Sequence, residues 1–167
     1  MNIFILSTDP HRCAKYHCDR HVVKMILESA QMLCTAHHEL GSNIDNKILY
    51  RSAFKNHPCA VWVRKSSANY EWLYQLFRNL CKEYYHRYNK IHKTAKRLYF
   101  PLSQHPLEIP KGSRTSFALA MPDEYKTDCP VRSYRLYYQY EKVYDRGGAK
   151  MLLYTYRSPP KWLEIPY

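Results

Sequence analysis

The amino-acid sequence predicts a mainly α-helical fold: a single-domain helical bundle with a long proline-rich loop and a short extended N-terminal segment. Its 167 residues suffice for a sizeable core, so we expect residues 1–167 to form one domain. Only 4 glycines stand against 10 prolines, which favours helices separated by proline turns over a strand-rich fold. Apolar residues also recur at helical spacing in two long stretches.

The first forty residues predict an extended segment followed by a long helix. Residues 1–6 are mostly apolar and indicate a short buried strand or an extended entry segment. Asp9 and Pro10 are typical of a helix N-terminus, because the carboxylate can cap the helix and proline fits its first turn. The helix can continue to Leu40, which is long for a globular protein, so we expect a kink or break within residues 17–21.

The middle of the chain predicts three further helices and a basic extension. Short helices are expected over Asp45–Phe54 and from Pro58 to Arg64. Ser66 and Ser67 can cap a longer helix, and a basic helical extension is expected over residues 90–100. The longer helix shows the spacing of a buried seam at Tyr70, Leu73, Phe77, Leu80 and Tyr84.

Five prolines between Pro101 and Pro130 predict a loop of about 30 residues, and loops of this length are usually functional. A tyrosine-rich helix is expected over Val131–Asp145, ended by residues 146–148.

The chain is strongly basic, with 26 Lys and Arg against 14 Asp and Glu, a net charge of +12. This surplus favours a nucleic acid or nucleotide as partner. No apolar stretch of about 20 residues indicates a membrane span. The 6 cysteines include no Cys-x-x-Cys pair and no secretion signal is evident, so we expect reduced thiols and a cytoplasmic protein. The 17 tyrosines offer stacking surfaces for bases.

One stripe of the first long helix carries an unusual density of reactive side chains. Two imidazoles, a cation and a carboxylate follow one another there, with Asp19 and Arg20 beside them. The stripe consists of His17, His21, Lys24, Glu28, Gln31 and Thr35. The opposite stripe predicts a core face and consists of Cys18, Val22, Ile26, Leu33, Ala36 and Leu40.

We interpret the stripe as a candidate site in which Arg20 and Lys24 hold a phosphate. The candidate catalytic residues are His17, Asp19, His21 and Glu28. The simpler alternative is a solvated helix face on which Glu28 pairs with Lys24 one turn away. A metal bound by the two histidines is disfavoured by the neighbouring Lys24, and we expect neither a metal nor a cofactor.

Three other groups could take part in ligand or nucleic-acid binding. A turn histidine followed by a tryptophan and an arginine suits stacking and phosphate contact, although the tryptophan could equally be core: His57, Trp62 and Arg64. An acidic pair inside the long loop could be catalytic or contact a ribose, or simply start a helix: Asp123, Glu124, Tyr125 and Lys126. A basic aromatic face could grip a sugar-phosphate backbone: Arg132, Arg135, Lys142, Lys161 and Trp162.

Five segments, residues 2–6, 17–33, 56–64, 69–73 and 120–126, give the chain a resemblance to a known family. It is similar to small phage proteins labelled pyrimidine dimer DNA glycosylase, or endonuclease V-like. The resemblance implies a free N-terminal amine that attacks the sugar C1′ and forms a Schiff base, and a catalytic glutamate directly after an arginine. It also implies an infected host cell as the place of action.

The sequence departs from that pattern at two points. Residue 2 is Asn, whose bulk opposes removal of Met1, so the amine would be that of Met1. Arg20 is followed by His21, and Glu28 lies two turns further along, at a position that is not equivalent.

Three functional hypotheses follow from these residues. The first is a DNA glycosylase with AP lyase activity on damaged or modified bases. The second is a non-catalytic protein that binds and sequesters a nucleotide in counter-defence. The third is an enzyme acting on free nucleotides, with His17 and His21 as acid and base.

Overall fold

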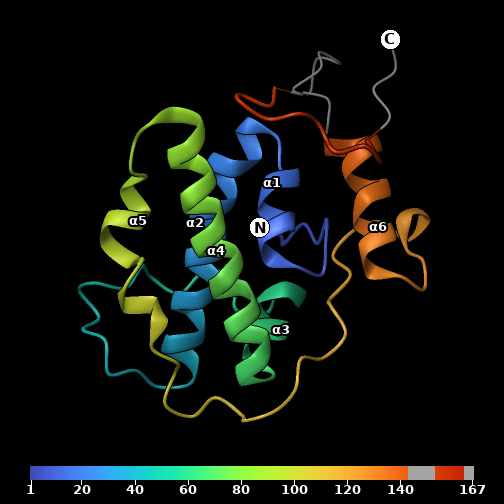
Figure 1. Cartoon of the computed structure of the whole chain (residues 1–167). Helices are drawn as coiled ribbons and strands as arrows, with labels where there is room; N and C mark the ends of the chain where they lie inside the picture. The colour runs from blue at the N-terminus through green and yellow to red at the C-terminus, as the bar shows by residue number, and fades with distance from the viewer. Residues whose placement is uncertain (143–152, 164–167) are drawn as a thin grey trace.

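The computed structural model describes residues 1–142 and 153–163, and six α-helices form the body of this part of the chain (Figure 1). They are α1 (Pro10–Tyr16), α2 (Asp19–Glu39), α3 (Pro58–Arg64), α4 (Ser67–Tyr88), α5 (Lys93–Leu98) and α6 (Pro130–Tyr137). Two 3-10 turns, η1 (Pro101–Ser103) and η2 (Asp123–Tyr125), and a π-helical turn, η3 (Tyr138–Lys142), complete the order. These ranges contain no strand, so the mainly α-helical fold is confirmed.

The break expected within residues 17–21 separates α1 from α2. His17 and Cys18 have extended backbone, with ψ angles of 134° and 165°. The backbone N–H of Cys18 donates to the hydroxyl of Tyr138 at 2.9 Å rather than to a helical carbonyl. His17 therefore lies before α2 and not on its surface stripe.

The short helix predicted over Asp45–Phe54 is wrong, because this segment forms turns. The Asp45 carboxylate accepts a hydrogen bond from the backbone N–H of Lys47 at 2.8 Å, which closes an Asx turn. Arg97 of α5 donates to the carbonyls of residues 47–49. Because a distant side chain donates to these carbonyls, they are not available as acceptors for the i to i+4 hydrogen bonds of a helix.

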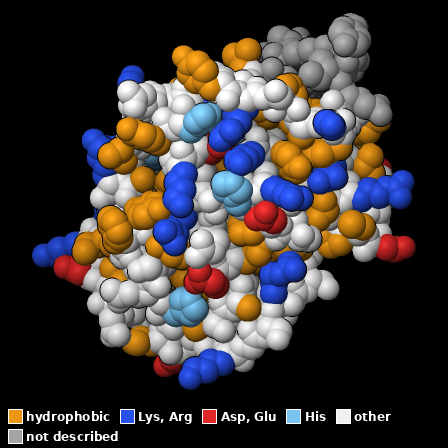
Figure 2. All heavy atoms as spheres, in the orientation of Figure 1, with side chains coloured by type: hydrophobic (Ala, Val, Ile, Leu, Met, Phe, Trp, Pro, Cys, Tyr) orange, Lys and Arg blue, Asp and Glu red, His pale blue; other side chains and the backbone are white. Residues whose placement is uncertain are grey.

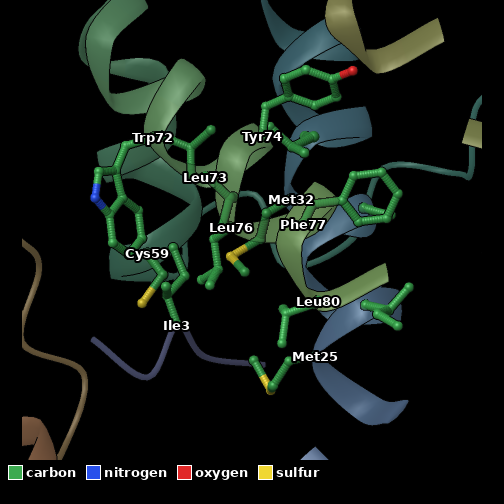
Figure 3. Close-up of a cluster of buried hydrophobic side chains, with 14 of the residues drawn as sticks. Ile3, Met25, Met32, Cys59, Trp72, Leu73, Tyr74, Leu76, Phe77 and Leu80 are labelled. Carbon is green, nitrogen blue, oxygen red and sulfur yellow. The ribbon is translucent and has the colours of Figure 1, made fainter. Parts of the chain in front are cut away.

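The core lies mainly between α2 and α4, which cross in the centre of the molecule (Figure 1). Figure 3 shows Met25 and Met32 of α2 facing the seam of α4, with Ile3 and Cys59 closing one side. The predicted seam is confirmed as buried from Tyr70 to Leu80, whereas its last residue, Tyr84, is half-buried. The N-terminal segment belongs to this core, since Ile3, Phe4, Ile5 and Leu6 are each at most 5 % exposed. It is extended but pairs with no strand.

The sequence predicted the first residues of the helices more accurately than their last residues. The hydroxyl of Ser66 accepts from the backbone N–H of Asn69 at 3.2 Å and caps α4 as expected. The basic extension over residues 90–100 is not continuous with α4, because Asn89 adopts the left-handed conformation with φ of 50° and ends the helix. The separate helix α5 covers only Lys93–Leu98.

The predicted loop over residues 101–130 contains only the two 3-10 turns and runs along the lower edge of the view to α6 (Figure 1). Its middle is tied to the core by Asn69, whose Oδ1 accepts from the backbone N–H of Thr115 at 2.9 Å. The helix predicted over Val131–Asp145 begins one residue earlier and is described as far as Lys142. Residues 143–148 lie outside the described part of the chain. Among the described helices, none combines the length and apolarity that crossing a membrane requires.

Candidate active site

A small pocket of about 180 Å³ lies where the N-terminal segment meets α2 and the end of α6. Three residues of the predicted stripe line it, namely His21, Lys24 and Glu28. The other lining residues are Met1, Asn2, Phe4, Tyr137 and Lys142. The pocket therefore joins segments that are up to about 140 residues apart in the sequence.

Glu28 lies at the centre of this pocket, beside the N-terminal amine. Its Oε2 is 3.9 Å from the nitrogen of Met1 and accepts a hydrogen bond from the backbone N–H of Asn2 at 2.9 Å. Its Oε1 lies 3.5 Å from Nζ of Lys24, the i to i+4 pair expected from the sequence. Although Glu28 does not follow Arg20 directly, the extended N-terminal segment brings the amine to it.

The two histidines of the stripe are buried and neutral. His17 is wholly buried, and its Nδ1 lies 2.7 Å from the carbonyl of Cys13. His21 is 5 % exposed, and its Nδ1 lies 2.8 Å from the hydroxyl of Tyr138. Burial lowers the pKa of His17 to about 4 and that of His21 to about 3, the latter helped by the neighbouring cations. His17 has no surface open to a ligand, whereas His21 lines the pocket, so of the two only His21 is placed for the catalytic role that the sequence predicts.

These buried histidines predict a loss of stability in mild acid. The unfolded chain takes up protons below pH 6.5, whereas the folded pKa values of His17, His21 and His37 are only about 3 to 4. The unfolded state thus binds more protons in this range, and the free energy of unfolding should fall by about 1.4 kcal/mol per pH unit for each histidine. Urea titrations at pH 6.5, 6.0, 5.5 and 5.0 measure this slope.

A substitution isolates the contribution of one histidine. His17→Gln should make the slope between pH 6 and 5 shallower by about 1.4 kcal/mol per pH unit. His11→Gln, at an exposed position, is the matched control and should leave the slope unchanged. Equal slopes in the wild type and His17→Gln would contradict the assignment of His17 as a buried neutral group.

Two other predicted site residues belong to the fold and not to the pocket. Asp19 is 9 % exposed and is held by Arg87, whose Nη1 donates to it at 2.8 Å. Its other oxygen accepts from the hydroxyl of Thr155 at 2.6 Å. Trp62 is 3 % exposed and packs on Phe117 with ring centroids 5.2 Å apart. Asp19 is held by internal hydrogen bonds, and neither side chain lines the pocket, so the catalytic role of Asp19 stays a prediction. Trp62 takes the core position that the sequence left open as an alternative, although its indole Nε1 has no hydrogen-bond partner among the described residues.

The remaining ligand candidates of the first half lie around the pocket. Arg20 is exposed on α2, one turn before Lys24, and its charge contributes to the lowered pKa of His21. His57 caps α3, its Nδ1 accepting from the backbone N–H of Cys59 at 3.2 Å. Burial and the amine of Met1 lower the pKa of His57, which indicates that it lies near the pocket. Arg64 is half-buried at the end of α3 and does not line the pocket.

The acidic group of the long loop reaches the pocket only through Tyr125. Asp123 pairs with Lys126 at 2.6 Å, and the hydrogen bond from that lysine lowers the pKa of Asp123. Asp123 and Glu124 form the exposed first turn of η2, the alternative that the sequence left open. The Tyr125 ring lies 5.6 Å from that of Tyr137, which lines the pocket. The loop thus contacts a residue that lines the pocket, but none of its own residues lines it.

The residues of the predicted basic aromatic face lie in two different parts of the surface. Lys142 lines the pocket, with its Nζ 4.6 Å from the centre of the Tyr137 ring. Arg132, Arg135 and Trp162 line a second, open groove of about 340 Å³. Lys161 is exposed beside Trp162. Figure 2 shows how basic side chains spread over the middle and right of one face, with hydrophobic side chains between them.

The sequence analysis did not identify the part that Phe4 and the Asn2 side chain play in this site. The apolar run at residues 3–6 predicted burial, but nothing in it indicated that Phe4 would pack on His21, with ring centroids 5.1 Å apart. The polar Asn2 within this apolar segment was the available signal.

One of three comparisons with known proteins finds a match. No curated protein and no solved structure matches the chain. The family model described as pyrimidine dimer DNA glycosylase matches residues 1–96, which include the N-terminal segment, α2 and α3. This match spans more than half of the sequence and contains Met1, Lys24 and Glu28 of the pocket. The chain therefore belongs to the pyrimidine dimer DNA glycosylase family.

Proposed function

We propose that this protein is a DNA glycosylase with AP lyase activity, in which the amine of Met1 is the nucleophile and Glu28 the acid–base group. The proposal rests on one observation above all: a free amine and a carboxylate lie 3.9 Å apart in a pocket. The Met1 side chain is only 2 % exposed, so the methionine is itself packed in place. Such a protein would act in the cytoplasm of a phage-infected host cell.

The chemistry requires the amine to be unprotonated at the moment of attack. Its lone pair forms a bond to the sugar C1′, the bond from C1′ to the base breaks, and the base leaves with that electron pair and gains a proton. Glu28 accepts the proton that the amine loses and delivers it to O4′ of the sugar, as the C1′–O4′ bond breaks and the C1′=N⁺ Schiff base forms. The carboxylate regenerated in this step then stabilises the cationic Schiff base. Removal of a C2′ proton from the Schiff base expels the 3′ phosphate and cleaves the strand.

The size and charge of the pocket favour this function over nucleotide sequestration. Its volume of about 180 Å³ is below the range of about 300–1,000 Å³ typical of pockets that enclose small-molecule ligands. It can admit a sugar, while the rest of the DNA stays outside. Lys24 and Lys142 at its edge, with Arg20 beside them, are suited to the flanking phosphates. Arg132, Arg135, Lys161 and Trp162 would hold the backbone further along.

The test is a single-turnover assay with two duplexes, one carrying a cyclobutane thymine dimer and one an abasic site, with and without borohydride. We expect strand cleavage of both and a borohydride-trapped complex whose tryptic map shows the DNA adduct on Met1. Intact-mass analysis of the protein establishes beforehand that Met1 is present.

A variant extended by two residues before Met1 should lose trapping by about 100-fold, because its amine no longer fits beside Glu28. The matched control carries the same two residues at its C-terminus and should trap like the wild type. Failure of the wild type to cleave or trap either duplex would contradict the proposal. Mass spectrometry of co-purified small molecules would then test nucleotide binding.

A further inference from the structure

The side chain of Asn2 is held by four hydrogen-bond partners, namely the backbone N–H of Ile3, the thiol of Cys59, the carbonyl of Ala120 and the hydroxyl of Tyr134. Its Oδ1 accepts from the backbone N–H of Ile3 at 2.8 Å and from the thiol of Cys59 at 3.4 Å. Its Nδ2 donates to the carbonyl of Ala120 at 2.8 Å. Donor and acceptor both have partners, so the orientation of the amide is fixed.

The thiol and the hydroxyl that contact this amide belong to buried side chains. Cys59 is 1 % exposed, and burial raises the pKa of its thiol to about 11, so it stays protonated and can donate. Tyr134 is wholly buried, and its hydroxyl joins the loop and the amide, lying 2.7 Å from the carbonyl of Ala118 and 3.3 Å from Oδ1 of Asn2. The amide is therefore clamped between α3, α6 and the long loop.

The clamp determines where the first two main-chain nitrogens lie. With the side chain of Asn2 turned into the protein, its backbone N–H points to Oε2 of Glu28 at 2.9 Å. The preceding residue then has its amine 3.9 Å from the same oxygen. A chain terminus is ordinarily among the most mobile parts of a protein. Here a side-chain amide takes the place of the main-chain pairing that would otherwise restrain it.

We propose that Asn2 is the positioning residue of the reaction: its clamped amide holds the amine of Met1 at the distance and angle from which it attacks C1′. This inference rests on the proposed function. It assigns the long loop a role too, because the carbonyl of Ala120 supplies the acceptor for the Nδ2 donor. Asn2 does not touch the reacting carbon and acts only through Met1.

The test compares Asn2→Leu with a matched control on the abasic duplex. Leucine keeps the bulk that opposes removal of Met1, which intact mass verifies, but makes none of the hydrogen bonds. The control is Asn69→Leu, since Asn69 is another buried amide that ties the long loop to a helix, with its Nδ2 2.7 Å from the carbonyl of Trp62. Within the described part of the chain, its hydrogen bonds go to Trp62, Ser66 and Thr115 and not to the N-terminal segment.

Asn2→Leu should lower the maximal rate of borohydride trapping by about 100-fold, as a misplacement of about 1 Å does, and change the DNA dissociation constant by less than about threefold. Asn69→Leu should lower the melting temperature but retain the wild-type trapping rate in its folded fraction. If Asn2→Leu does not fold, Asn2→Asp keeps the acceptor Oδ1 but turns a carboxylate oxygen towards the carbonyl of Ala120 in place of the donor, and a loss of at least about tenfold is expected.

Wild-type trapping rates in both Asn2 variants would overturn the positioning role and leave the proposed function intact. Equal rate losses in Asn2→Leu and Asn69→Leu would also overturn it, because they would show a general effect of loosening the loop. A wild-type protein that does not trap the abasic duplex would overturn both proposals.

Discussion

Replacement of Glu28 by glutamine is expected to lower the single-turnover rate on the thymine-dimer duplex by about 10²–10⁴-fold, the usual contribution of a general acid–base group. The amide keeps the shape of the carboxylate and can still accept the hydrogen bond of Asn2, so the pocket should not collapse. It cannot take the proton of the amine or balance the charge of the Schiff base. DNA affinity should change by less than about threefold, because the phosphate contacts are made by the cations. Quenched-flow cleavage and fluorescence anisotropy measure the two quantities separately.

The matched control for this substitution is Glu71→Gln on α4. Glu71 is half-buried, accepts from Gln75 at 2.6 Å, lies 3.2 Å from Nε2 of His105 and does not line the pocket. It removes the same charge from the protein and should leave both cleavage and binding unchanged. An equal gain of affinity in the two variants would mean that net charge is responsible. Full activity of Glu28→Gln would remove Glu28 from the mechanism.

Most of the fold could be predicted from local signals in the sequence. The caps at Asp9 and Ser66 set the starts of α1 and α4, and the apolar spacing from Tyr70 to Leu80 gave the face that α4 buries. These features depend on neighbours within one or two helical turns, which is the range that propensity and periodicity describe. The helix predicted over Asp45–Phe54 was wrong because the conformation of this segment is set by Arg97, some fifty residues further along.

The site was less predictable, because its central contact joins the first residue of the chain to the middle of α2. Helical spacing correctly put His21, Lys24 and Glu28 on one stripe, and these three line the pocket. The same spacing wrongly included His17, because the break at Cys18 takes it off α2. Nothing local distinguished Asp19, which forms ion pairs inside the protein, from Glu28, which faces the amine. That difference depends on which distant cation reaches each carboxylate.

Arg87→Met is expected to destabilise the protein by about 3–5 kcal/mol, the usual cost of removing one partner from a buried ion network. The Arg87 side chain is wholly buried and lies between two carboxylates, with Nη1 2.8 Å from Asp19 and Nη2 2.9 Å from Glu83. Methionine fills a similar space but leaves both carboxylates short of a cation in a poorly solvated place. Arg157 still pairs with Glu83 at 2.7 Å, and this limits the loss. Urea unfolding at pH 7 measures it.

The pH dependence of this loss identifies the network as its cause. Burial alone would raise the pKa of Glu83, but the hydrogen bonds and charges of Arg157 and Arg87 bring it below the ordinary 4.5. A lowered carboxyl pKa stabilises the fold above about pH 4.5, and that contribution is lost as the pH falls through the folded pKa. The difference in unfolding free energy between the wild type and Arg87→Met should therefore be full at pH 7 and shrink below pH 4.5.

Lys82→Met, at an exposed position of the same helix, is the control and should change stability by no more than about 0.5 kcal/mol. A loss of unfolding free energy below about 1 kcal/mol in Arg87→Met, or a loss that does not depend on pH, would contradict the contribution of this ion network to stability.

The ion network matters for the site because Arg87 also donates to the carbonyl of Lys15 at 3.3 Å. It thereby joins the end of α1 to Asp19 at the start of α2. The angle of that junction sets the direction of α2, and with it the position of Glu28 relative to the amine.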